Sequence, residues 1–273
     1  MNRKLYTFIL IVIACMSIYA QGKKRAFHQH EIGIFIGGSY YLGDLNPRKH
    51  FYMTRPAFGG FYRYAWDYRG AARFGFNWGQ IEGDDAQSEN KDQIERNLNF
   101  KSSIQEIYGI AEFNFYDYRI GNEKHFFTLY VFAGFDVFHF NPLGNVGGNS
   151  WIELRPLRTE GQSKAYPLWQ VSIPFGIGIK INVAKNVGLG IEWGPRKTFT
   201  DYLDDVSNKY PNLSLNPPKG QMGILMSNRT KYPWFFISGY SRGNPYTKDW
   251  YFFTGLTINI KLTSKEPCYA TGM

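Results

Sequence analysis

Carboxylates are concentrated in one stretch of the sequence that could bind a cation or organise a loop. The stretch consists of Asp201, Tyr202, Leu203, Asp204 and Asp205. Its oxygen atoms could hold Ca²⁺, which prefers carboxylate ligands. Alternatively, the carboxylates cap a short helical turn and pair with Arg196 or Lys197, which precede them. We favour the second interpretation and expect no metal ion at this position.

The histidines are the other side chains whose spacing could support chemistry. His139 follows Asp136 by three residues, and a histidine held by a carboxylate is a common catalytic base. In an extended strand, however, these two residues point to opposite faces. His28 and His30 would place both rings on one side of the chain, but no further metal ligand lies close in sequence. We therefore expect neither a catalytic pair nor a metal site.

The composition argues against several function classes. The chain has 273 residues, with 31 Lys or Arg, 22 Asp or Glu and a formal net charge of +9. Its basic residues are scattered, without an arginine-rich run, so we expect no nucleic-acid partner. The sequence also lacks a glycine-rich phosphate loop, a zinc motif and a nucleophile elbow. We expect no catalytic residues and no cofactor.

Long strands are the elements that must position these residues. From Trp169 to Val183, every second residue is large and apolar, and the intervening residues are polar or small. This alternation predicts a β-strand with one apolar face. Strands of soluble proteins usually have about five or six residues, whereas this run could cross a hydrocarbon layer at the tilt of barrel strands.

Seven further segments alternate in the same way, which gives eight predicted strands. These segments are residues 30–42, 58–66, 72–78, 105–115, 125–140, 186–196 and 250–262. Short turns between strands alternate strictly with long connections, the pattern of outer-membrane barrels. The long connections are residues 44–56, 83–99, 141–167 and 201–248. The predicted fold is all-β: an eight-stranded antiparallel up-and-down transmembrane β-barrel with long extracellular loops and periplasmic termini.

The two faces of the strands predict where the charges lie. In a narrow membrane barrel the apolar face meets lipid and the other face fills the lumen, where charges must pair. We predict a lumen network of Glu31, Arg63, Arg73, Glu106, Glu112, Lys180, Glu192, Arg196 and Lys261. Within it, Lys180 is expected to pair with a neighbour such as Glu192, and no open pore should remain. Aromatic girdles are expected from Trp66, Trp78, Tyr116, Trp169, Trp193 and Trp250.

The N-terminal segment has the order of an export signal. Basic residues precede the apolar stretch 5–14, and the small residue Ala20 follows it. The predicted organisation is a signal peptide at 1–20, a barrel domain at 21–262 and a periplasmic tail at 263–273. The alternative is a lipobox at 12–15, which would make Cys15 the lipidated first residue of a lipoprotein. Either arrangement takes the chain out of the cytoplasm.

Cys15 and Cys268 are the two cysteines of the chain. Under the signal-peptide interpretation the first is removed, which leaves Cys268 unpaired in an oxidising compartment. Cys268 could then form an intermolecular disulfide or remain an idle exposed thiol in the tail. Both possibilities stay open.

Several motifs resemble those of a known family. They are TFTDYLDDVS at 198–207, RGNP at 242–245, DWYF at 249–252, EIG at 31–33 and GGSYYLGDL at 37–45. Together they resemble the PorG-type outer-membrane proteins of Bacteroidetes and frame nearly the whole mature chain. The resemblance implies a non-enzymatic barrel associated with the type IX, gliding-associated secretion system. It also implies contact with periplasmic ring proteins of the PorK and PorN type, and it implies no catalytic residues.

We therefore expect an anchoring subunit of a secretion apparatus, embedded in outer-membrane lipid. The first alternative is a barrel enzyme that acts on outer-membrane lipid or glycan through its long loops. The second is a generic structural outer-membrane protein. A narrow channel is disfavoured by the mixed charges of the predicted lumen.

Overall fold

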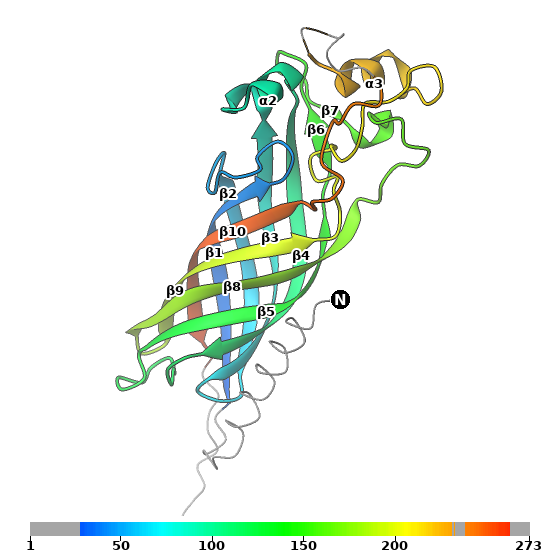
Figure 1. The fold of residues 1–273 in the computed structure, drawn as a ribbon. Helices are drawn as coiled ribbons and strands as arrows, with labels where there is room; N and C mark the ends of the chain where they lie inside the picture. Colours follow the sequence, from blue (N-terminus) through cyan, green and yellow to red (C-terminus); the bar gives the residue numbers. More distant parts are fainter. Residues whose placement is uncertain (1–27, 231, 233–237, 263–273) are drawn as a thin grey trace, which may run out of the picture.

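The computed structural model describes residues 28–230, 232 and 238–262, and these form an antiparallel barrel (Figure 1). Its strands are β1 (Gln29–Leu42), β2 (Arg55–Ala65), β3 (Gly70–Asp84), β4 (Asn99–Asn114), β5 (Phe127–His139), β8 (Trp169–Ala184), β9 (Val187–Thr198) and β10 (Trp250–Lys261). Each strand pairs with its neighbours along this series, and β1 pairs with β10, which closes the ring. The predicted eight-stranded up-and-down barrel is therefore confirmed.

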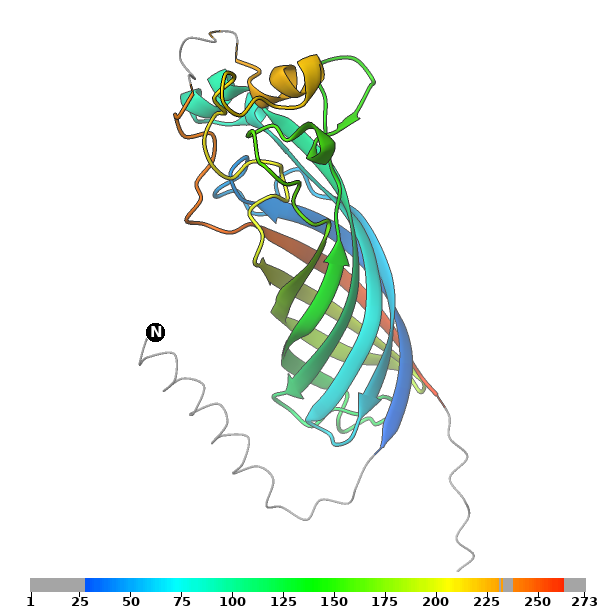
Figure 2. The same ribbon diagram turned by 90° about the vertical axis from the view of Figure 1, so that its right-hand side faces the viewer.

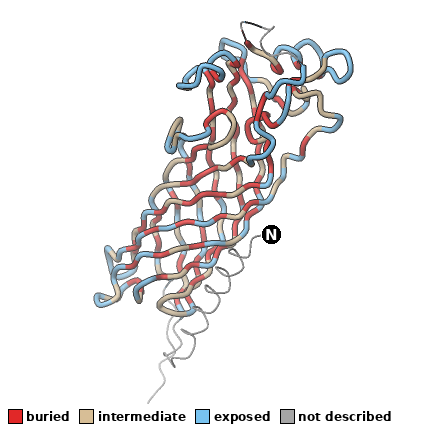
Figure 3. Tube along the Cα trace, in the orientation of Figure 1, coloured by how far each residue is buried: buried red, intermediate tan, exposed pale blue. Residues whose placement is uncertain are grey.

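Alternation along the strands produces an apolar exterior and a polar interior. Outward-facing Ile107 and Phe135 are 64% and 76% exposed, whereas inward-facing Arg63 and Glu112 are 1% and 3% exposed. Buried and exposed residues alternate along the barrel wall (Figure 3). A soluble barrel would bury its apolar face, so this arrangement is the one that lipid requires of a membrane-spanning barrel. Among the described helices, none has the length and apolar character needed to cross a membrane.

Strands β3 and β4 extend further than the segments predicted at 72–78 and 105–115. Their pairing continues to Asp84 opposite Asn99, and the pair rises above the ring (Figures 1 and 2). Here the faces exchange character, because the inward residues become apolar and the outward ones polar. The inward residues are Ile81, Phe100 and Ile104, and the outward ones are Gln80, Glu82 and Lys101. This reversal indicates that the extension lies beyond the membrane, where an apolar interior is favoured.

The largest apolar core lies at this loop end of the barrel. Strand residues such as Phe100 and Phe253 pack there against loop residues such as Leu154, Leu203 and Met226. The long loops also contain short elements that the sequence analysis did not predict. They are η1 (Asp85–Gln87), α2 (Lys91–Arg96), β6 (Pro142–Gly144), β7 (Ile152–Glu153), η2 (Arg155–Leu157) and α3 (Gly220–Ser227).

The described chain begins and ends at the barrel end opposite the long loops (Figure 2). The amide of Leu262 donates to the carbonyl of His30 at 2.8 Å, which ties the last described residue to the first strand. The predicted signal peptide at 1–20, the Cys15 alternative and the tail at 263–273 with Cys268 lie outside the described residues. These remain predictions.

The reversal of face character yields a paired test. Replacing Ile34, in the middle of the outward face of β1, with Arg should lower the free energy of unfolding by about 2–4 kcal/mol, because the charge would face hydrocarbon. Gln80→Arg, outward on the β3 extension, should change it by less than about 1 kcal/mol. Guanidinium titration of the mature chain in phospholipid vesicles measures both. Equal losses of stability for the two variants would contradict the conclusion that the β3 extension lies beyond the membrane.

Candidate functional site

Glu112, on β4, is the centre of the charges inside the barrel. Its carboxylate forms ion pairs with Arg63 Nε at 2.7 Å, with Arg73 Nε at 2.9 Å and with Lys180 Nζ. The three cations come from β2, β3 and β8, so they approach from both sides of β4. Glu112 is 3% exposed, and its charge is therefore compensated by side chains rather than by water.

The ion pairs continue from Glu112 to the rest of the lumen. Arg63 Nη1 also lies 2.7 Å from Glu31 Oε1, and Arg73 Nη1 lies 2.9 Å from Glu192 Oε2. Glu192 additionally accepts a hydrogen bond from the Tyr130 hydroxyl at 2.8 Å. The expected pairing of Lys180 with Glu192 is therefore wrong, since Lys180 reaches Glu112 instead.

A second pair and an aromatic cluster complete the lumen. Arg196 Nη2 lies 2.8 Å from Glu106 Oε1, nearer the loop end. The guanidinium of Arg73 lies 4.9 Å from the ring centre of Phe61 and 5.4 Å from that of Phe132. Such contacts add favourable energy to buried cations. Charged and aromatic side chains together fill this part of the barrel interior.

Lys261 is the one predicted lumen residue that the structure leaves outside the network. It is the last residue of β10, at the turn end, and it is partly exposed. It lies opposite Glu31 in the strand register, yet it has no ion pair with any residue between 28 and 262 that the structure describes. The carboxylate of Glu31 is already engaged by Arg63, Gln29 and Asn259. The prediction for Lys261 is corrected accordingly.

The long connections pack together over this end of the barrel, and we call this packed layer the loop cap. The acidic segment 201–205 is buried within the loop cap rather than lying on its surface. The hydroxyl of Tyr41, at the end of β1, donates to Asp204 Oδ2, and the amide of Val206 donates to Asp204 Oδ1 at 2.9 Å. Asp249 Oδ2 accepts the amide of Leu203 at 3.0 Å. Leu203 itself is fully buried. The segment therefore attaches the longest loop to the barrel rim.

Asp205 joins the same loop to the connection between β5 and β8. Its carboxylate accepts hydrogen bonds from Thr159 and from the Tyr166 hydroxyl, the latter at 2.7 Å. Arg242 Nη1 donates to the backbone carbonyl of Asp205 at 2.5 Å, and Arg242 Nη1 lies 3.1 Å from Glu160. Tyr202 stacks on Tyr166 with ring centres 4.7 Å apart. Two loops are thus cross-linked through one acidic motif.

The predicted partners of this acidic segment are wrong. Arg196 points into the lumen toward Glu106, and Lys197 points outward with Nζ 4.5 Å from the ring centre of Trp250. Asp201 instead accepts from the Ser207 hydroxyl at 2.7 Å and lies 3.7 Å from Lys248 Nζ. No helix forms over the described residues 201–205, where the Asp205 amide donates to the Tyr202 carbonyl at 3.3 Å in a single turn. Among the described residues there is also no group of His, Cys, Asp or Glu arranged to hold a metal ion, so the calcium alternative gains no support.

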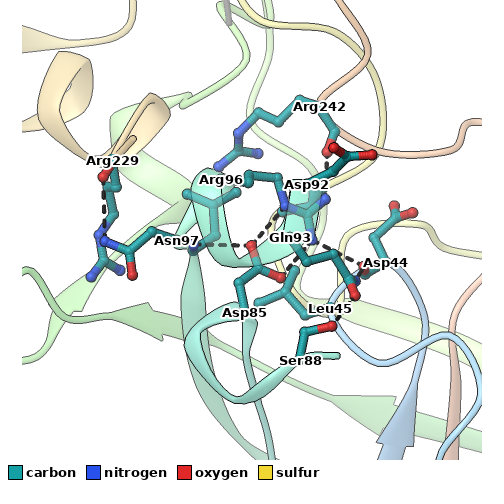
Figure 4. Close-up of polar contacts among 12 residues, drawn as sticks. Asp44, Leu45, Asp85, Ser88, Asp92, Gln93, Arg96, Asn97, Arg229 and Arg242 are labelled. Atoms are coloured by element: carbon teal, nitrogen blue, oxygen red, sulfur yellow. Dashed lines mark hydrogen bonds and ion pairs between the residues drawn. The ribbon is translucent and has the colours of Figure 1, made fainter. Parts of the chain in front are cut away.

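Arg96 connects three loops at the top of the cap (Figure 4). It lies at the end of α2, and its Nε and Nη2 atoms each lie 2.7 Å from an oxygen of Asp85. The same guanidinium donates to the carbonyls of Arg242 at 2.6 Å and of Asp44 at 3.0 Å. Gln93, one turn earlier, also donates to the carbonyl of Asp44 at 2.8 Å. The cap is therefore a single hydrogen-bonded unit.

Sequence analysis did not identify Arg96, and it recognised Arg242 only as part of the resemblance motif 242–245. An arginine in a polar loop helix carries no local signal, because Asp85 lies 11 residues away and the other acceptors are backbone carbonyls more than 50 residues away in sequence. In the structure His139 and Asp136 have different hydrogen-bond partners. His139 lies 3.1 Å from Gln105, whereas Asp136 accepts from Ser172 at 2.6 Å. His28 contacts the Tyr64 hydroxyl at 2.6 Å.

Comparison with protein families gives one match. A family model described as "Domain of unknown function (DUF6089)" matches residues 3–240. The chain belongs to this family. A search of curated proteins found no match to the DUF6089 chain.

Solved structures similar to the DUF6089 barrel include the following three. Ail of Yersinia pestis in complex with sucrose octasulfate is 12% identical, with a TM-score of 0.41, covering 86% of this chain and 99% of that chain. The N-terminal β-barrel domain of Pseudomonas aeruginosa OprF is 11% identical, with a TM-score of 0.36 and coverage of 86% and 100%. Neisserial surface protein A is 9% identical, with a TM-score of 0.35 and coverage of 86% and 97%. The architecture of the DUF6089 chain is defined by its own strand pairing.

Removal of the Glu112 carboxylate should destabilise the DUF6089 barrel strongly. Glu112→Gln leaves three buried cations without their shared counter-charge, and breaking a buried ion pair costs about 3–5 kcal/mol. Denaturant titration in detergent micelles measures the loss. Glu123→Gln, the same change at an exposed position in the β4–β5 turn, should cost less than about 0.5 kcal/mol. A Glu112→Gln variant as stable as Glu123→Gln would refute the role of Glu112.

The cap of the DUF6089 chain should be more stable in mild acid than at neutral pH. Burial raises the pKa of Asp44 and of Asp205 from 3.8 to about 6, and burial also raises the pKa values of Asp204 and Asp249. The folded chain therefore holds protons that the unfolded chain has released, so the free energy of unfolding falls as the pH rises from about 4 through 6.

Denaturant titrations at pH 5 and pH 8 measure this effect. The wild-type chain should lose at least about 1.4 kcal/mol between them, the equivalent of one pKa unit. Asp204→Asn, which removes one of the carboxyls that must ionise, should reduce the loss, whereas Asp92→Asn on the exposed face of α2 should not. Stability that rises between pH 5 and pH 8 would contradict the assignment.

Proposed function

We propose that the chain is a non-enzymatic outer-membrane β-barrel that anchors a larger protein assembly. The observation that carries the proposal is the lumen, where Glu112 and its three cations, together with aromatic rings, occupy the interior. An eight-stranded barrel has space only for such side chains, so it offers no route for solutes. Its activity must then be exerted at the two ends or at the lipid-facing wall.

The apolar exterior supports a membrane location for this subunit. Outward residues such as Ile34 and Phe135 are exposed all around the ring, and closed barrels of this kind are characteristic of bacterial outer membranes. The predicted export signal at 1–20 agrees with that destination. In the proposed orientation the long loops are extracellular and the short turns face the periplasm.

The assembly that we propose is the type IX secretion apparatus. The support is the resemblance of the motifs at 198–207 and 242–245 to PorG-type proteins. In this structure those motifs build the cap, since Asp205 and Arg242 cross-link the loops. The periplasmic ring proteins of the PorK and PorN type would then contact the opposite end, at the turns 115–126 and 185–186.

Deletion of the gene tests the secretion role directly. Loss of the barrel should abolish or greatly reduce export of type IX cargo, measured as cargo in the culture medium and on the cell surface. Wild-type chain supplied from a plasmid should restore it. Normal cargo export in the deletion strain would reject the secretion role but would not change the conclusion that the chain is a membrane barrel.

Charge reversal at the turns tests the contact surface. Lys124 and Lys185 are exposed on the β4–β5 and β8–β9 turns. Lys124→Glu combined with Lys185→Glu should reduce recovery of ring proteins in a pull-down from detergent-solubilised membranes. Lys91→Glu, an exposed lysine of α2 at the loop end, is the matched control and should leave recovery unchanged. Full recovery of the ring proteins with the Lys124→Glu, Lys185→Glu variant would show that the turn end is not the contact surface.

Because the lumen is filled, we predict that the barrel does not conduct ions. Purified barrel in a planar bilayer should produce no discrete single-channel steps, because the buried ion pairs occupy the conduction path. Stable conductance steps from the wild-type chain would favour the channel alternative instead.

A further inference from the structure

Above the barrel ring, one edge of β3 has no neighbouring strand in the part of the chain that the structure describes. Pairing between β2 and β3 ends with Ala57 opposite Gly79, whereas β3 continues to Asp84. On its other side, β3 remains paired with β4 up to Asp84 opposite Asn99. We call residues 80–84 of β3 the open edge. Such an edge carries backbone groups that can pair with another chain.

The sequence around the start of β2 explains why the pairing ends. Continuing the β2–β3 register places Pro56 opposite Gln80, and proline has no amide N–H to donate. The Ser39 hydroxyl donates to the Gln80 carbonyl at 2.6 Å instead. Before β2, Phe51 and Met53 have φ values of +60° and +50°, so the chain there is not extended and cannot continue the ladder.

The backbone groups of the open edge point alternately toward β4 and away from it. The amide of Asp85, directly after β3, donates at 2.9 Å to the carbonyl of the residue that precedes β4. Because N–H and C=O groups alternate along a strand, those of Ile81 and Gly83 also face β4. Those of Glu82 and Asp84 face away from it, and they have no hydrogen bond to any other described residue.

A pocket of about 500 Å³ lies at the end of the open edge, and we call it the edge pocket. Its walls are the β1–β2 connection and the segment that leads from β3 into α2. Asp84 and Tyr52, which the β2–β3 register would place opposite each other, both line it. Lys49 Nζ lies 2.8 Å from Glu89, and the Tyr52 hydroxyl donates to the Gln87 carbonyl at 3.1 Å. These contacts hold the two walls together.

The surroundings of the open edge select the kind of molecule that it can bind. The edge belongs to the part of β3 whose inward face is apolar and whose outward face is polar, which places it in water rather than among lipids. Its unpaired donors and acceptors have the spacing of a strand, and a second polypeptide backbone matches that spacing. Five residues of strand span about 17 Å, so the matching segment is short.

We propose that the open edge binds an extended segment of a partner polypeptide, which joins β3 as an additional strand. The segment exchanges backbone hydrogen bonds with Glu82 and Asp84, and one of its side chains enters the edge pocket. It occupies the position that β2 would fill if β2 were as long as β3. The inference is independent of the secretion role, because it depends only on the extension of β3 above the ring.

Hydrogen exchange in the wild-type chain tests the open edge before any partner is added. In detergent micelles, nuclear magnetic resonance should show the amides of Glu82 and Asp84 exchanging at least about tenfold faster than their neighbours at 81 and 83, which face β4. Equal protection of all four amides would overturn the proposal, because the edge would already be paired.

Peptides supply the second test. A phage-displayed library of random heptapeptides is selected against the full mature chain in lipid nanodiscs. We expect peptides that protect the amides of Glu82 and Asp84 from exchange. N-methylation of every second peptide amide should weaken binding at least about tenfold in one register and little in the other, because only one register faces β3. Absence of any peptide that protects these two amides would overturn the proposal, as would equal effects of methylation in both registers.

Two substitutions at one position separate the backbone from the side chain. Glu82→Pro removes an N–H that faces away from β4, so it leaves the β3–β4 ladder intact and should weaken peptide binding about tenfold. Glu82→Gln loses the same ion pair with Arg55 but keeps the N–H, and it should bind as the wild-type chain does. Undiminished binding by Glu82→Pro would overturn the proposal. The exchange measurement and the methylated peptides use the wild-type chain, so they decide the question even if Glu82→Pro does not fold.

A second copy of the chain is the other occupant that an open edge could take. We expect both the wild-type chain and Glu82→Pro to be monomeric in detergent micelles, measured by size-exclusion chromatography with light scattering. A wild-type dimer that Glu82→Pro converts to a monomer would assign the open edge to self-association and overturn the proposal.

Discussion

A charge inside a narrow, closed barrel must find its partner among the side chains around it, and the rest of the structure depends on this constraint. The lumen has little room for water, so an isolated ion there would carry most of its desolvation cost. Glu112 meets the constraint by binding three cations from three other strands. These pairs require the strands to be in register, and two of them, with Arg63 of β2 and Lys180 of β8, link Glu112 to strands that are not adjacent to β4 in the ring. The register of the strands, the closure of the ring and the filling of the lumen therefore depend on one another.

The loop cap follows the same rule with different groups. Its carboxylates are buried above the membrane, where hydroxyls and backbone amides bind them in addition to cations. Tyr41 binds Asp204, and Tyr166 binds Asp205, while Arg96 and Arg242 each donate both to a carboxylate and to backbone carbonyls. Because carbonyls accept hydrogen bonds without carrying full charge, the arginines fix loop backbones in place. The long loops consequently form a packed structure on the barrel rim.

A barrel with a filled interior presents three surfaces to other molecules. The cap presents its outer face, the turn end presents its exposed lysines, and the wall presents aromatic rings at the membrane edge. Two of these surfaces meet on the outer wall, where Phe51 and His50 of the β1–β2 connection pack on Tyr40 and Phe252.

The alternation of residues by itself determined the strands, their number and the sense of their faces, because period two is a local property that lipid and lumen impose on every strand. The alternation placed Glu112 and Lys180 in the lumen, but it did not predict that they pair with each other. It also assigned Lys261 to the lumen network, whereas Lys261 has no ion pair with the described residues. Only the tertiary structure decided which ions pair, that β3 and β4 continue above the membrane, and that Arg96 joins three loops. Those outcomes depend on strand tilt and on loop packing between residues distant in sequence, for which no local pattern exists.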